Sequence, residues 1–83
     1  MNKERKNDQG RLVEFGFEKR DGYVFAEVTS INCQARVSVL IDGNKVNEGL
    51  WVFPSDTSYA SAKIEEGQKY YCEWEWDGNV IPL

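Results

Sequence analysis

The side chains that most often carry chemistry are sparse in this sequence. It has no histidine, the residue most used as a general base and as a metal ligand. Cys33 and Cys72 lack the neighbouring cysteine or histidine that a zinc site or a cysteine nucleophile needs. Glu65, Glu66 and Asp77 do not have the spacing of a calcium loop, and no glycine-rich phosphate loop is present. We therefore expect no catalytic residue, no metal site and no cofactor, and we interpret the protein as non-enzymatic.

Aromatic residues with acidic neighbours indicate binding instead. The run Leu50-Trp51-Val52-Phe53 is apolar at every position, so in a strand one alternating pair faces outward unless something covers it. The covering alternative is the loop from Pro54 or the end of the chain. Exposed apolar patches often mark interaction sites. The candidate binding residues come from this run and from outward positions of two other strands: Trp51, Phe53, Tyr59, Tyr71, Glu73 and Glu75.

A strand over residues 70–76 is expected to anchor the core that positions these candidates. Its alternation places Tyr70, Cys72, Trp74 and Trp76 on one face. The candidates Tyr71, Glu73 and Glu75 lie on the other face. A large aromatic side chain buries roughly 150–250 Å², so two inward tryptophans can anchor a small core. Tyr70, Trp74 and Trp76 are therefore predicted to be structural.

Six further strands are predicted from alternation and turn signals. Asp-Gly pairs at 21–22, 42–43 and 77–78 indicate three tight hairpins. The strands are expected at 11–18, 23–30, 35–41, 45–53, 58–64 and 80–83, with a bulge in the fourth near residues 47–49. Residues 1–10 have no periodic pattern and predict a disordered polar tail ahead of one β-sandwich domain over residues 11–83.

The hairpins and the longer links between them predict an all-β, seven-strand antiparallel sandwich, with a small β-barrel as the alternative. Residues 64–70, Ile-Glu-Glu-Gly-Gln-Lys-Tyr, resemble the corner before the sixth strand of fibronectin type III domains, and Tyr70-x-Cys72 is similar to the Tyr-x-Cys of immunoglobulin domains. The resemblance implies an immunoglobulin-like sandwich in which the Tyr70 hydroxyl binds the backbone upstream. Glu66 departs from the proline of that family, and the second strand has no tryptophan.

Antiparallel pairing of the third and sixth strands has two consequences. Arg36 is expected on the outer face beside Glu73 or Glu75. Cys33 and Cys72 are expected too far apart along the sheet for a disulfide, which needs Cα atoms within about 7 Å. Both cysteines should be free thiols, with Cys72 buried and Cys33 more exposed.

The balance of charge narrows the class of partner. There are 14 acidic and 10 basic residues, a net charge of −4, which argues against binding to nucleic acids or anionic membranes. We expect a cytoplasmic protein-binding module, monomeric or a weak homodimer, such as an adaptor or an inhibitor of the kind mobile elements encode. The alternative is a carbohydrate-binding module that stacks sugars on exposed aromatic rings.

Overall fold

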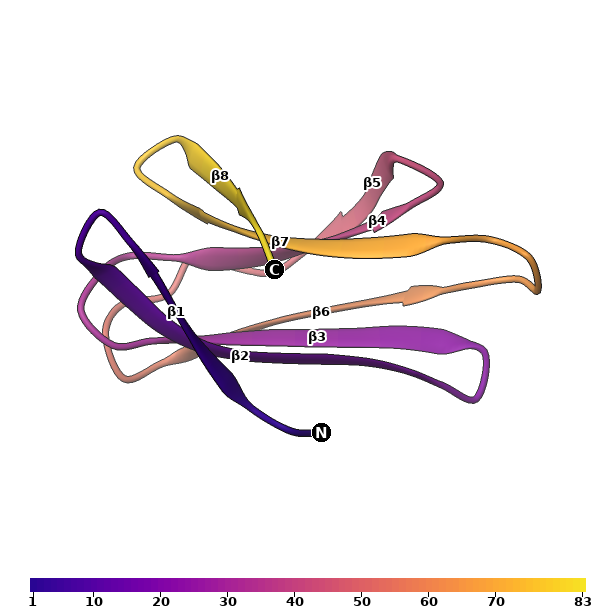
Figure 1. Cartoon of the computed structure of the whole chain (residues 1–83), viewed down its shortest axis with the longest axis horizontal. Coiled ribbons are helices and arrows are strands. Elements are labelled where there is room, and N and C mark those ends of the chain that lie inside the picture. The colour runs from indigo at the N-terminus through magenta and orange to yellow at the C-terminus, as the bar shows by residue number, and fades with distance from the viewer.

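Eight β-strands form in the computed structural model, which describes every residue from Met1 to Leu83. The strands are β1 (Glu4–Asp8), β2 (Arg11–Arg20), β3 (Tyr23–Ser30), β4 (Arg36–Ile41), β5 (Asn44–Glu48), β6 (Thr57–Lys63), β7 (Tyr70–Trp76) and β8 (Asn79–Pro82). Two antiparallel four-stranded sheets result, in the orders β1-β2-β3-β6 and β5-β4-β7-β8. The sheets pack face to face as a sandwich (Figure 1) and do not close into a barrel, so the barrel alternative is wrong.

The three predicted hairpin turns are confirmed. In each, the aspartate and the glycine both have positive φ, as in Asp77 (φ 46°) and Gly78 (φ 81°), which a two-residue turn of this type requires. A fourth turn of the same kind, Gln9-Gly10, joins β1 to β2.

The expected disordered tail over residues 1–10 is wrong, because Glu4–Asp8 form β1. This strand pairs with β2 from Glu4 opposite Phe15 to Asp8 opposite Arg11. Its side chains are mostly exposed, so the sequence shows no alternation even though the backbone completes the sheet edge. The indole nitrogen of Trp76 donates a hydrogen bond of 2.8 Å to an oxygen of Asp8, which ties β1 to the opposite sheet.

The core lies between the sheets and contains the predicted inward residues of β7. Trp74 is fully buried, while Trp76 and Cys72 are nearly so, and valines of β3 and β4 pack around them. β4 and β7 pair antiparallel with Arg36 opposite Glu75 and Val39 opposite Cys72, as predicted. The two cysteines are free, Cys72 buried and Cys33 partly exposed.

The corner before β7 differs from the expectation in one respect. The Tyr70 ring is partly buried and meets Phe17 edge-on, with the ring centroids 6.2 Å apart. Its hydroxyl forms no hydrogen bond, so the predicted bond to the upstream backbone is absent. The backbone of the corner is held instead by Asp42, which accepts from the Lys69 amide at 3.0 Å.

The fourth predicted strand, 45–53, is too long. β5 ends at Glu48, and its bulge falls at Val46, because Val39 pairs with Asn47 and Leu40 pairs with Lys45. Beyond Glu48 the regular pairing with β4 ends, and an isolated bridge joins Val52 to Ala35, the residue just before β4. The apolar run therefore lies in an irregular segment that passes from one sheet to the other.

Candidate functional site

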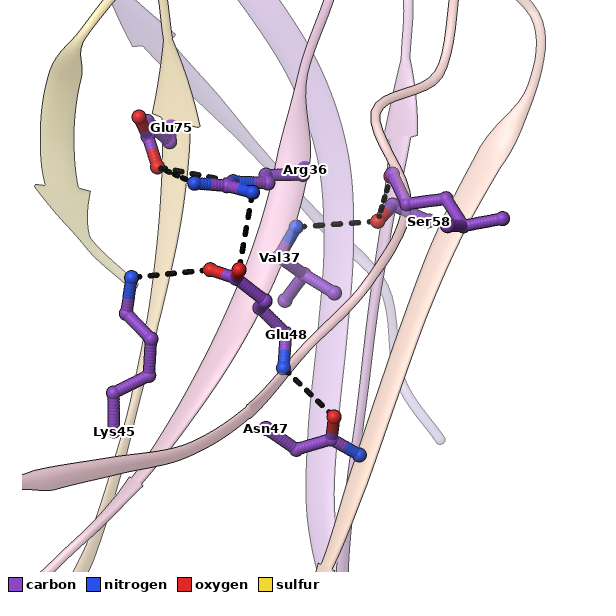
Figure 2. Close-up of polar contacts among 8 residues, drawn as sticks. Arg36, Val37, Lys45, Asn47, Glu48, Ser58 and Glu75 are labelled. Carbon is purple, nitrogen blue, oxygen red and sulfur yellow. Dashed lines mark hydrogen bonds and ion pairs between the residues drawn. The ribbon is translucent and has the colours of Figure 1, made fainter.

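The segment of residues 49–53 is irregular but its backbone is fixed at both ends. The Gly49 amide donates to the Val37 carbonyl at 2.8 Å, and Ala35 and Val52 exchange two backbone hydrogen bonds of 3.0 and 2.9 Å. From the other sheet, the Ser58 hydroxyl donates to the Leu50 carbonyl at 2.7 Å. The same hydroxyl accepts from the Val37 amide at 3.3 Å, so it links β4 to the segment (Figure 2).

Gly49 allows this close approach between the segment and β6. A Cβ at this position would collide with the Ser58 hydroxyl and would lie only 2.6 Å from the carbonyl oxygen of Tyr59. Glycine is therefore the residue that lets the segment pass against β6.

Three large apolar side chains of this segment project into solvent. Leu50 is 83% exposed, Phe53 is 68% exposed and Trp51 is 38% exposed, whereas Val52 is buried. We call Leu50, Trp51 and Phe53 the apolar ridge. The predicted covering by the loop from Pro54 or by the chain end does not occur: the loop pairs with the end of β3 through Ser55 and Ser30, and Leu83 packs against the core.

Arg36 joins the apolar ridge to the outer face of its sheet. Its guanidinium carbon lies 4.7 Å from the centroid of the Trp51 ring, a cation–π contact. The same guanidinium pairs with Glu75 at 3.1 Å and with Glu48 at 3.2 Å, and Lys45 pairs with Glu48 at 3.1 Å (Figure 2). The predicted pairing of Arg36 with Glu75 is confirmed, and this network restrains Trp51.

The structure brings only some of the predicted site residues together. Trp51 and Glu75 both contact Arg36, and Phe53 lies on the same 49–53 segment as Trp51. Tyr71 and Glu73 share the outer face of β7 with Glu75, but Tyr71 is opposite Leu40, roughly 13 Å along the strand from Glu75. Glu73 has no ion-pair partner.

Tyr59 lies apart from all of these residues. It is an exposed residue of β6, opposite Glu27 of β3, on the outer face of the other sheet. The four aromatic candidates therefore do not form one platform.

Two residues of the site were missed by the sequence analysis. An alternating strand places Leu50 on the same face as buried Val52, but Leu50 is the most exposed side chain of the run. The signal that could have found it is Asn47-Glu48-Gly49, a polar stretch with glycine that ends β5. Glu48 was missed because its pairing with Arg36 follows from the register of β5 on β4.

The site offers apolar contact and charge pairing. No group of three or more His, Cys, Asp or Glu side chains could hold a metal ion. Burial raises the pKa of the Cys72 thiol to about 12, which keeps it protonated and poorly nucleophilic. The chain has no helix suited to crossing a membrane.

Comparison with protein-family models, with curated proteins and with solved structures gives no match for this chain.

Proposed function

We propose that this protein is a non-enzymatic protein-binding module whose contact surface is the apolar ridge. The observation that carries the proposal is the exposure of Leu50, Trp51 and Phe53 on a backbone that hydrogen bonds fix to β4 and β6. Burying apolar surface in a complex is favourable by about 25 cal/mol per Å². A backbone that is already fixed loses little conformational entropy on binding, so more of this energy appears as affinity.

Trp51 is the proposed anchor of the interface. Tryptophan is enriched among the residues that dominate binding energy, and Arg36 holds this one against the sheet. The carboxylates of Glu48 and Glu75 pair with the same Arg36 guanidinium and suit a polar rim around an apolar centre. Binding without chemistry is what an adaptor or an inhibitor does, and we place the module in that class.

Carbohydrate binding has weaker support. A stacking platform needs several exposed rings on one face, and Tyr59 and Tyr71 lie away from the apolar ridge. One face of the Trp51 ring is also occupied by Arg36.

We further propose a fibronectin type III-like or immunoglobulin-like affiliation for the sandwich. The sheets β2-β3-β6 and β5-β4-β7-β8 correspond to strands A-B-E and C′-C-F-G of immunoglobulin-type sandwiches, with β1 added at an edge. The strand order supports this affiliation, whereas the unpaired Tyr70 hydroxyl does not.

The expected setting is the cytoplasm, with a monomer or a weak homodimer as the free state. Two unpaired cysteines in a domain of this size support a reducing compartment. The acidic balance supports a protein partner over nucleic acid or an anionic membrane.

The proposal is tested by comparing partner capture between two alanine variants. Trp51→Ala should weaken the complex by about 2 kcal/mol or more, roughly a thirtyfold loss of affinity, because the anchor is removed. Tyr23→Ala is the matched control, since Tyr23 is a similarly exposed aromatic residue on the other sheet.

The readout has two steps. Proteins from the native cell lysate are captured on the immobilised wild-type chain, and the captured protein is then purified and titrated against each variant. Equal affinity for Trp51→Ala and Tyr23→Ala would place the contact surface elsewhere.

A further inference from the structure

The first three residues lie across the outer face of the β1-β2-β3-β6 sheet. Strand pairing between β1 and β2 begins at Glu4, and ahead of it Met1 and Asn2 lie over Gly16 of β2. Figure 1 places the N-terminus beyond this sheet, on the side away from the other sheet. We call residues 1–3 the N-terminal strap.

Gly16 forms the seat of the strap. A Cβ at Gly16 would lie 2.8 Å from the Met1 sulfur and 2.9 Å from the Asn2 carbonyl oxygen. A glycine inside a strand weakens the strand and often marks close approach of another backbone. The glycine in β2 is therefore explained by the chain that crosses it.

A carboxylate next to this seat receives the lysine of the strap. The Lys3 ammonium lies 3.0 Å from the carboxylate of Glu27, which is directly opposite Gly16 on β3. The Glu27 side chain is only 18% exposed, and no other lysine or arginine is within ion-pair distance of it. The hydrogen bond from Lys3 and the negative charge of Glu27 raise the pKa of the Lys3 ammonium.

We call the surface formed by Gly16, Glu27 and the pocket next to them the groove. The strap fills only the part of the groove over Gly16 and Glu27. A pocket of about 320 Å³ opens beside Met1, with Phe25, Glu27 and Tyr59 in its walls. Tyr59 is largely exposed, so the apolar wall of this pocket meets solvent. An occupant longer than the strap would gain apolar contact here that the strap does not make.

The strap itself is held weakly. Lys3 is 51% exposed, and an ion pair exposed to this degree contributes little to stability. Met1 is about half exposed as well. The strap has one advantage over a separate partner: because it is tethered to the domain, its effective concentration at the groove is high.

We propose that this groove is a second protein-binding site, for a partner segment that carries a lysine next to an apolar side chain, and that the strap occupies it in cis. The chemistry of the partner segment is inferred from the strap, which places the apolar Met1 side chain over Gly16 and the Lys3 ammonium on Glu27. This site is on the opposite sheet from the apolar ridge and does not depend on it.

The test is an NMR titration of the ¹⁵N-labelled full-length chain with an amidated Met-Asn-Lys tripeptide. In Lys3→Ser the strap loses its ion pair, so the peptide should shift the Gly16, Glu27 and Tyr59 amides. The wild-type chain should need severalfold more peptide for the same shifts, because its own tethered Lys3 competes for Glu27.

Four controls separate this site from nonspecific binding. The double variant Lys3→Ser/Glu27→Gln should lose the response, because the carboxylate is gone, whereas Lys3→Ser/Glu18→Gln should keep it. Lys3→Ser/Gly16→Ala should also lose it, because the new methyl group fills the seat. A Met-Asn-Glu peptide should not bind.

The proposal is overturned if Lys3→Ser shows no shifts at these amides, or if its response is the same with and without the Glu27 carboxylate. Equal binding of the lysine and glutamate peptides would also overturn it.

Discussion

The indole nitrogens of the two core tryptophans have opposite surroundings. Trp76 donates to Asp8 at 2.8 Å, and the Arg11 guanidinium covers its ring at 4.3 Å. Trp74 is fully buried, and its indole nitrogen has no hydrogen-bond partner. Trp74 thus contributes packing alone, whereas Trp76 also connects β1 to the opposite sheet.

A double-mutant cycle should detect this difference. We expect Asp8→Ala and Trp76→Phe to be coupled by about 1–2 kcal/mol in the free energy of unfolding, because either change removes the same hydrogen bond. The control is Asp8→Ala with Trp74→Phe, whose effects should add. Urea unfolding of the six chains (wild type, three single variants and two double variants) gives both values. Additivity in both pairs would mean that β1 is not docked on Trp76.

The Cys72 thiol predicts a dependence of stability on alkaline pH. Its pKa is raised from 9.0 to about 12 by burial, so the folded state favours the neutral thiol. The stability that this group contributes is fully present below about pH 9 and is lost as the pH rises toward about 12, because the unfolded thiol ionises first.

The measurement is the free energy of unfolding of wild type and Cys72→Ala at about pH 8 and about pH 11. Between these two pH values Cys72→Ala should lose less stability than the wild type, because it has no thiol to ionise. Val39→Ala, which removes a side chain without a titratable group from the same core, should keep the wild-type pH dependence. The burial of Cys72 would be contradicted if its removal left that dependence unchanged.

At the scale of elements, the segment of residues 49–53 determines how the sandwich closes along one side. It leaves β5, stays beside β4 through Val52 and contacts β6 through Ser58. The same contacts that close the sandwich turn Leu50, Trp51 and Phe53 outward. Exposure of the apolar ridge is therefore a consequence of how the two sheets are joined.

Gly49→Ala should destabilise the fold by about 1–3 kcal/mol, because the added methyl group meets β6 backbone that cannot move aside. Gly16→Ala is the comparison: the new methyl group meets the Met1 side chain and the Asn2 carbonyl of the weakly held strap, which can lift off the sheet, so the cost should stay within about 0.5 kcal/mol. Thermal or urea unfolding measures both. Similar costs for the two glycines would argue against the tight passage at Gly49.

Across the whole molecule, local sequence patterns were sufficient to predict most of the strands. Alternation located β2, β3, β4, β6 and β7, and the Asp-Gly pairs located three hairpins and with them the starts of β5 and β8, because both signals report the conformation of consecutive residues. The inward face of β7 was predictable since tryptophans at every second position need a core. The antiparallel register that places Arg36 beside Glu75 followed from the strand order.

Long-range contacts account for what was not predicted. β1 is polar and lies at a sheet edge, so only its pairing with β2 makes it a strand. β5 stops at Glu48 because Gly49 must meet Ser58, a contact between separate elements. Tyr59 was grouped with the other aromatic candidates, but the sheet to which a strand belongs is decided by the assembled topology.

The central claim, that a partner covers the apolar ridge, can be tested by quenching of tryptophan fluorescence. Trp51 is 38% exposed whereas Trp74 and Trp76 are buried, so a neutral quencher such as acrylamide should reach Trp51 first. The chain is titrated with quencher alone and in complex with its captured partner, after that partner's own tryptophan signal has been subtracted. The account predicts that the complex protects Trp51, and that the protection is absent from Trp51→Phe. A complex that forms while Trp51 remains as accessible as in the free chain would contradict it.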